Sequence, residues 1–152
     1  MTWKPHVTVA AVIEHSGYFL CVEETIEGRS RLNQPAGHLE PGESLTDAII
    51  REVREETTRA FTPEALVGVY LWRAGPRHPT FLRVTFTGYV DESDPALQTD
   101  TEIDANVWLS PDDIRTRRRE WRSPLVMQCI DDYLAGQRYP LSLLRSLVDA
   151  TP

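Results

Sequence analysis

The chain has 152 residues, of which 41% are hydrophobic and 26% are charged, and these values are ordinary for one globular domain. Its formal net charge of −7 provides no general attraction for nucleic acids or for an anionic membrane surface. We therefore expect a single domain over residues 1–152 that acts on a small molecule, with no nucleic-acid or membrane partner. The composition leaves the oligomeric state open between monomer and homodimer.

The N-terminal residues predict a β-hairpin. Residues 6–14 are rich in β-branched side chains, residues 15–17 form a turn, and residues 18–23 return as a second strand. The opening stretch has no long apolar run, so we expect neither a signal peptide nor a membrane span, and by default a cytoplasmic protein. In that compartment Cys21 and Cys129 are expected to be reduced core residues.

A glycine-rich loop and a helix follow. Residues 31–35 predict a short strand, and the loop GHLEPGE at 37–43 holds two glycines and a proline. Ser44 lies three residues before Asp47, which is typical of a capped helix start, so we predict a helix from Thr46 to about Arg59. Its expected apolar stripe contains Ile49, Ile50, Val53 and Ala60.

The second half of the chain predicts further strands and shorter helices. These are strands at 65–74 and 80–90 joined by a hairpin loop, an acidic loop at 91–104, a strand at 105–110, a short helix capped by Ser110, a basic run at 115–121, a helix from Ser123 to Leu134, and a short C-terminal helix. The elements together predict an α+β fold with a mixed sheet.

Three glutamates of the predicted helix share one face. Glu52, Glu55 and Glu56 occupy positions i, i+3 and i+4, where like charges repel. A solvated face balanced by neighbouring arginines is the simplest explanation. Against it, the acids converge on one stripe, Ala48 one turn earlier leaves room for an approaching group, and Glu43 lies in the preceding loop.

Converging carboxylates are suited to a hard divalent cation. Mg²⁺ and Mn²⁺ prefer oxygen ligands, and Mg²⁺ is often held by one or two carboxylates together with substrate phosphates. Such an ion relieves the repulsion between the acids and polarises a phosphoryl oxygen. It also lets an acidic protein bind a phosphate ester.

The segment GHLEPGESLTDAIIREVREETTR resembles the Nudix box. In that motif a glycine is followed by a glutamate and then by Arg-Glu, an apolar residue, any residue and Glu-Glu, and every spacer length is kept here. One departure occurs at Thr58 and Arg59, where the family usually has glycine and an apolar residue. The departure affects the end of the helix rather than the expected metal ligands.

Shorter motifs outside the box resemble the NudJ-type branch of bacterial Nudix phosphatases. They are LNQPAGHLE, PTFLR, RSPLV and GQRYPL. The resemblance implies a Nudix-like α/β/α sandwich with a mixed sheet. It also implies a Mg²⁺-dependent hydrolase acting on phosphoanhydride bonds, which releases phosphate from nucleoside di- and triphosphates and from the pyrophosphates of thiamine and hydroxymethylpyrimidine.

The resemblance also implies roles for the residues of the box. Mg²⁺ ligands are expected from Glu52, Glu55 and Glu56 with the Gly37 carbonyl, and Arg51 is expected to orient Glu43 through an ion pair. The general base is either a glutamate of the box or an acid outside it, for which Glu102 is the candidate. An ordinary acidic loop explains Glu102 equally well.

Candidate substrate contacts lie in and after the box. His38 is placed to contact a phosphate, although a loop histidine without a role is at least as common. Arg83 alternates with apolar residues in a strand and is suited to clamp a phosphate, unless it forms a salt bridge across the sheet. Trp72 and Phe81 flank the same hairpin and can stack on a ring, whereas strand aromatics more often fill the core.

Two alternative functions stay open at this point. One is a Nudix pyrophosphatase of different specificity, for ADP-ribose or a damaged nucleoside triphosphate, because the metal site is shared while the pocket selects the substrate. The other is a non-catalytic nucleotide-binding regulator, which the complete set of box glutamates argues against. The basic run at 115–122 is expected to be a solvated turn.

Overall fold

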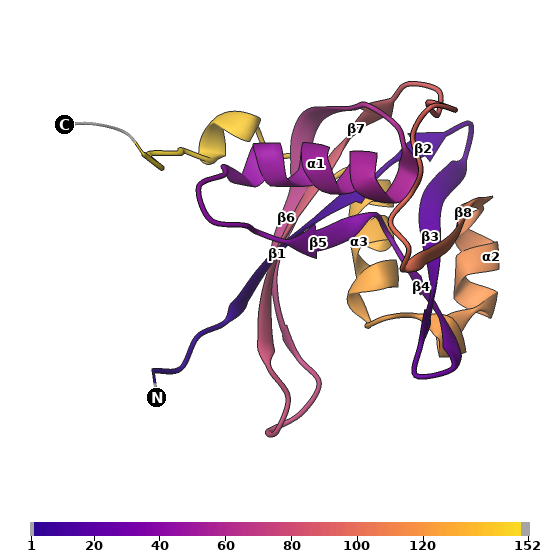
Figure 1. Ribbon diagram of the computed structural model, residues 1–152. Coiled ribbons are helices and arrows are strands. Elements are labelled where there is room, and N and C mark those ends of the chain that lie inside the picture. Colours follow the sequence, from indigo (N-terminus) through magenta and orange to yellow (C-terminus); the bar gives the residue numbers. More distant parts are fainter. Residues whose placement is uncertain (1, 150–152) are drawn as a thin grey trace.

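The computed structural model describes residues 2–149, which form eight strands, three α-helices and two short 3₁₀ helices (Figure 1). The strands are β1 His6–Val12, β2 Glu14–His15, β3 Tyr18–Ile26, β4 Arg29–Asn33, β5 Ala36–His38, β6 Phe61–Arg73, β7 Thr80–Val90 and β8 Ile103–Leu109. The helices are α1 Leu45–Thr57, α2 Pro111–Thr116, η1 Arg118–Glu120, α3 Leu125–Leu134 and η2 Leu141–Leu143.

The first sheet has the strand order β5-β1-β7-β6 and is mixed. Strands β1 and β7 are parallel, whereas β1 with β5 and β6 with β7 are antiparallel. Strands β6 and β7 form a long hairpin whose tip projects beyond the rest of the molecule (Figure 1). The two predicted strands are therefore confirmed, although β6 begins four residues earlier than its expected start at residue 65.

The second sheet is antiparallel and joins distant parts of the chain. Strand β3 pairs with β2, β4 and β8, and β8 comes from much further along the chain. The predicted N-terminal hairpin is present only at Glu14 and His15 of β2, because β1 pairs with β5 and β7 of the first sheet instead. The pairing of β3 with β8 shifts register between Glu23 and Glu24, which is a β-bulge. Bulges re-aim side chains, and this one lies where the second sheet approaches α1.

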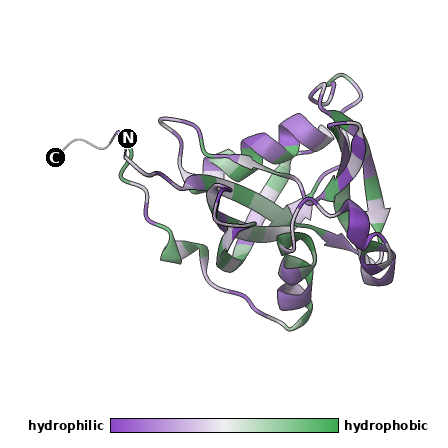
Figure 2. Cartoon of the chain, turned by 90° about the horizontal axis from the view of Figure 1, so that it is seen from below, coloured by the Kyte–Doolittle hydropathy of each residue, from purple (hydrophilic) through white to green (hydrophobic). Residues whose placement is uncertain are grey.

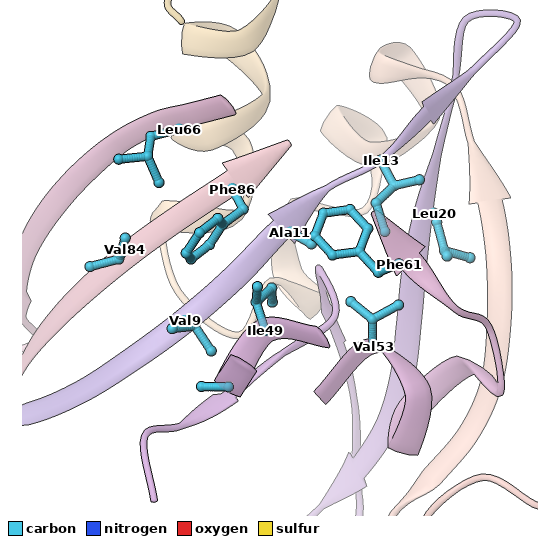
Figure 3. Close-up of a cluster of buried hydrophobic side chains, with 11 residues drawn as sticks. Val9, Ala11, Ile13, Leu20, Ile49, Val53, Phe61, Leu66, Val84 and Phe86 are labelled. Atoms are coloured by element: carbon cyan, nitrogen blue, oxygen red, sulfur yellow. The ribbon is translucent and has the colours of Figure 1, made fainter. Parts of the chain in front are cut away.

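Two hydrophobic clusters lie on opposite faces of the first sheet. Under α1, Ile49 and Val53 pack against Val9, Ala11 and Phe86 (Figure 3). The second cluster lies beneath α3 and contains Cys129, Ile130 and Val126 of that helix together with Val12 and Cys21. Hydrophobic residues concentrate accordingly in the central strands (Figure 2). Helices on both faces of a mixed sheet confirm the expected α/β/α arrangement.

Helix α1 begins and ends close to the predicted positions. The hydroxyl of Ser44 accepts a hydrogen bond from the Asp47 N–H at 3.0 Å, as expected for an N-cap. Thr58 follows the helix in the left-handed conformation with φ of 59°, at the position where the family usually has glycine. The helix therefore keeps its ordinary C-terminal geometry with a threonine in place of the glycine.

Other sequence expectations have mixed outcomes. Ala48 is fully buried in the core with Ile49, so the expectation that it leaves space beside the acids is wrong. Ala60 is exposed and lies beyond the helix instead of on its apolar stripe. The C-terminal helix is only the short turn η2 between described residues, and the last residues of that prediction, 150–152, lie outside the described part.

Two expectations about the rest of the chain are confirmed. Cys21 and Cys129 are free and buried, and burial raises the pKa of the Cys21 thiol to about 12. The capped helix at Ser110 is present as α2, with both hydrogen bonds of a capping box. No helix within residues 2–149 is long and apolar enough to cross a membrane.

Candidate active site

The three glutamates of α1 lie at its C-terminal half and approach strand β5. Glu56 is 6% exposed, and its Oε1 accepts a hydrogen bond from the Ala36 N–H at 2.7 Å. The Glu52 side chain is 12% exposed, whereas that of Glu55 is 40% exposed. The cluster therefore extends from a buried carboxylate at the edge of β5 to an open one at the surface.

Gly37 allows the Glu52 carboxylate to lie against the strand. Gly37 pairs with Val9, whose side chain belongs to the core under α1, so this face of β5 is directed toward the helix. A Cβ atom at position 37 would overlap the Glu52 carboxylate. Glycine is thus required at this position, because any side chain would fill the space in which the Glu52 carboxylate lies. This space beside Gly37 is called the cradle below.

Arg51 connects the loop acid to the helix acids. Its guanidinium donates to both carboxylate oxygens of Glu43, at 3.0 Å and 2.7 Å. It also donates to Glu52 at 2.8 Å, to Glu55 at 3.2 Å and to the His38 carbonyl at 3.0 Å. The expected ion pair of Arg51 and Glu43 is present, and Arg51 fixes the loop before the helix as well as two of its carboxylates.

Burial opposes ionisation of the inner carboxylates. Desolvation raises the pKa of Glu52 to about 7, against the opposing effect of Arg51. Burial raises the pKa of Glu56 to about 9, and the neighbouring acids Glu52, Glu24 and Asp100 add to the rise. In contrast, the hydrogen bonds from Arg51 lower the pKa of the Glu43 carboxyl. The protein therefore places too little positive charge near Glu52 and Glu56 to offset the effect of burial on their pKa values.

The donor set fits a hard divalent cation. It consists of carboxylate oxygens at the edge of β5, partly buried and with the cradle at Gly37 beside them. Within residues 2–149 no group of three or more His, Cys, Asp or Glu side chains already converges on a common point. Arg51 Nη1 instead donates hydrogen bonds to both Glu52 and Glu55.

Further acids approach the cluster from the second sheet and the acidic loop. The Asp100 N–H donates to the Glu55 carbonyl at 2.9 Å, which attaches the loop to α1. Glu102 is exposed on the same loop, with no hydrogen bond that ties it to the helix carboxylates. Glu24 at the β3 bulge was missed by sequence reasoning, and its charge contributes to the raised pKa of Glu56. The pairing of β3 with β8 brings Glu24 near the carboxylates of α1.

A cavity of about 380 Å³ opens on the opposite face of the first sheet, beside β5. Its lining includes all four predicted substrate residues: His38, Trp72, Phe81 and Arg83. The rings of Trp72 and Phe81 stack with centroids 5.9 Å apart. His6, also missed by sequence reasoning, lies with its Nδ1 3.2 Å from His38 Nε2. Because β5 contributes Ala36 and Gly37 to the lining, the cavity adjoins the carboxylate cluster.

Arg83 is buried in this cavity without an acidic partner. The residue is 6% exposed, and its guanidinium donates to the side-chain oxygens of Gln34 and Asn33, both at 3.2 Å. Among residues 2–149 no Asp or Glu forms a salt bridge with it. The salt bridge across the sheet, considered from the sequence, is therefore absent from the described residues.

The basic run divides between structural and pocket residues. Arg117 pairs with Glu120 and with Glu23 of β3, which holds the run against the second sheet. Arg122 and Ser123 line the cavity, and Arg122 Nη1 lies 3.2 Å from a carboxylate oxygen of Glu24. The expectation of a solvated turn is thus wrong for Arg117, which is half-buried between two acids. Arg122 is exposed, and its place in the cavity lining together with Ser123 agrees with the idea that these two residues face the site.

Comparisons with known proteins place the chain in one family. A family model described as NUDIX domain matches residues 4–129. The chain is 43% identical over 142 residues to proteins named Phosphatase NudJ from Shigella boydii serotype 4 and from Escherichia coli strain K12. Each alignment covers 93% of this chain and 92% of the relative.

Solved structures with a similar fold differ widely in their sequence identity to this chain. A NUDIX hydrolase from Nitrosomonas europaea superposes with a TM-score of 0.93 at 51% identity, covering 97% of this chain and all of that chain. A bifunctional NMN adenylyltransferase/ADP ribose pyrophosphatase from Francisella tularensis, complexed with AMP and a Mn ion, has a TM-score of 0.68 at 21% identity. That match covers 89% of this chain and 42% of the other, and it supports the fold alone.

Proposed function

This chain belongs to the NUDIX family and is a hydrolase acting on phosphoanhydride bonds, and we propose that it is a Mg²⁺-dependent enzyme that releases phosphate from nucleoside di- and triphosphates. Related small pyrophosphates, such as those of thiamine and hydroxymethylpyrimidine, belong to the same proposal. The observation that carries it is the junction at β5, where buried carboxylates on one side adjoin a cavity with an arginine and stacked aromatic rings on the other.

The carboxylates of α1 are the proposed metal ligands. Glu52, Glu55 and Glu56 would hold Mg²⁺ or Mn²⁺, with the Gly37 carbonyl as a further oxygen donor, and divalent metals are the usual cofactors of this family. When bound, the ion supplies a Lewis acid for a phosphoryl oxygen and lowers the pKa of a coordinated water. Arg51 then has to release Glu52 and Glu55 while it keeps its two hydrogen bonds to Glu43.

The general base is proposed among the acids that surround this cluster. Glu43 is held by Arg51 with its pKa lowered, so it stays ionised and is placed to orient a water. Glu102 is the proposed alternative outside the box, on the loop that Asp100 attaches to α1. Replacing each by glutamine and comparing the pH profiles of kcat separates the two.

The cavity is the proposed binding site for the rest of the substrate. Trp72 and Phe81 provide an aromatic wall for a nucleobase or a thiazole or pyrimidine ring. Arg83 and His38 provide hydrogen-bond donors for phosphate oxygens. The whole chain, residues 1–152, is proposed to act as one domain, since the Tyr139 segment after the matched region bonds back to Leu66 of β6.

Phosphate release by the purified protein tests the proposal. The panel contains nucleoside di- and triphosphates, thiamine diphosphate and ADP-ribose, each with and without Mg²⁺, and the Glu56→Gln variant serves as the control for metal binding. Metal-dependent release from the diphosphates, lost in the variant, is expected. Cleavage of ADP-ribose alone would overturn the substrate assignment, and no turnover together with tight nucleotide binding would favour a regulator.

A further inference from the structure

The outer edge of β6 is open over the second half of the strand. Strand β6 is the last strand in the order β5-β1-β7-β6 (Figure 1). Within residues 2–149 its outer edge pairs only at Leu66, which exchanges two backbone hydrogen bonds with Tyr139. Residues 67–73 therefore have no strand beside them on that side. An edge of this kind is a template for pairing with another strand.

The open segment lacks the features that usually protect an edge strand. Charged side chains and prolines discourage the approach of a second strand, but residues 66–72, LVGVYLW, contain neither. The register shifts of β6, which mark its β-bulges, all lie before Val69. Val69 and Leu71 are 55% and 72% exposed, although both are apolar. The edge is thus regular, uncharged and hydrophobic.

The exposed side chains of this edge lie on one face of the first sheet. Val69 pairs with Val84, and Val84 belongs to the hydrophobic cluster under α1. Leu71 is two residues further along the strand, so its side chain points to the same face as that of Val69. Helix α1 leaves both residues open, and their apolar surface is available to a second molecule.

The open segment is complementary to a second copy of itself. Antiparallel pairing about a two-fold axis at Tyr70 places residues 67–73 of one copy along the same residues of the other, so the pairing uses the whole open segment. Residues that lie opposite each other in an antiparallel pair share a face of the sheet. Val69 of each copy therefore meets Leu71 of the other, and the two most exposed apolar residues of the edge cover each other.

The charges at the two ends of the segment favour the same arrangement. Arg73 and Arg77 are exposed at the hairpin end, and Glu64 is exposed before the other end. None of the three forms a salt bridge with another residue among those that the structure describes. Antiparallel pairing places the arginines of each copy toward Glu64 of the other, whereas parallel pairing would place like charges together.

We propose that two copies of this chain pair through β6 and form a symmetric dimer in which the two first sheets become one continuous sheet. Because the contact is one strand wide, it lies at the small end of the range for protein interfaces, and the association is weak and depends on concentration. Trp72, which also lines the cavity, then lies in a strand that is paired on both sides. The dimer thereby holds the hairpin that forms one wall of the cavity.

Sedimentation equilibrium over a range of protein concentrations tests the association. The average mass is expected to rise from 17.3 kDa toward twice that value as the concentration increases. Leu71→Lys adds a charge at the centre of the interface in both copies and should weaken the dimer by about 10-fold or more. Leu147→Lys is the matched control, since Leu147 is 79% exposed in the C-terminal segment, and it should associate like the wild type.

Both replaced leucines are exposed, so the variants are expected to fold, and equal urea unfolding midpoints would verify this. A mass of 17.3 kDa at every concentration would overturn the proposal. Equal association of Leu71→Lys and wild type would also overturn it, because a dimer formed elsewhere on the surface does not require Leu71.

Disulfide cross-linking tests the register of the pairing. Val69→Cys and Leu71→Cys are made separately, and the native Cys21 and Cys129 are buried and do not compete. Opposite residues of an antiparallel pair lie within the Cα separation that a disulfide spans, whereas diagonal residues lie beyond it. An equal mixture of the two variants, oxidised with copper phenanthroline, should form a mixed covalent dimer about 10-fold faster than either variant forms one alone. Equal rates in the three samples, or no covalent dimer in the mixture, would contradict the proposed pairing.

Discussion

Replacing Gly37 by alanine is expected to abolish most activity without unfolding the protein. The φ angle of Gly37 is not positive, so alanine can adopt its backbone conformation without strain. The added Cβ would overlap the Glu52 carboxylate, which must withdraw by about 1 Å or more to reach an ordinary van der Waals contact. Because the obstructing atoms are the end of a flexible side chain, the carboxylate moves and the strand stays.

The expected magnitude follows from that displacement. Misplacing a catalytic group by about 1 Å can lower a rate by about 100-fold, so kcat for phosphate release should fall by roughly that factor. The affinity for Mn²⁺, measured by electron paramagnetic resonance, should fall in parallel, because the displaced group is a proposed ligand. The free energy of unfolding, measured in urea, should change by less than about 1 kcal/mol.

Two comparisons make this prediction decisive. Gly75→Ala is the matched control, since its Cβ would meet nothing closer than His78 at 3.5 Å, and it should retain Mn²⁺ binding. Adding Glu52→Asp to Gly37→Ala shortens the obstructed side chain and should recover part of the metal affinity. Unchanged kcat and Mn²⁺ affinity in Gly37→Ala would show that the position of Glu52 against β5 has no role in the site.

Three further predictions concern stability and reactivity. Ser44→Ala removes the N-cap of α1 and should lower the free energy of unfolding by about 1 kcal/mol in urea; no change would mean that water replaces the cap. Burial, and then the hydrogen bond to Asp132, raise the pKa of the Tyr70 phenol above its ordinary value of about 10. The stabilisation from Tyr70 is therefore complete below about pH 10 and is lost as the pH rises toward the folded-state pKa, and Tyr70→Phe should show a smaller alkaline loss of stability. Cys21 and Cys129 should not react with Ellman's reagent at pH 8 until urea unfolds the protein, and rapid reaction in the native state would contradict their burial.

Local sequence patterns predicted the helix of the site and its cap because the determining contacts are short-range. Ser44 and Asp47 are three residues apart, and the three glutamates fall on one helical face by spacing alone. The pairing of Arg51 with Glu43 is also local, at a separation of eight residues. The error at Ala48 arose because periodicity places a residue on a side of the helix without showing which neighbouring strand covers that side.

The cavity depended on contacts that no local pattern reveals. Arg83 reaches Gln34 across 49 residues, and Glu24 approaches the α1 acids only because β3 pairs with β8. From the sequence, Arg83 was equally compatible with a salt bridge and with a phosphate clamp. The choice depended on whether an acid lies near its guanidinium, which is a property of the folded sheet.

The tip of the projecting β6–β7 hairpin contributes to the cavity without contributing to the hydrophobic core. Its connecting residues, 74–79, belong to neither hydrophobic cluster, yet Ala74, His78 and Pro79 line the cavity. Insertions or replacements at this tip would alter the cavity lining while α1 and β5 keep their positions. The shape of the proposed binding cavity can thus change by small steps while the protein stays folded and keeps its set of carboxylates.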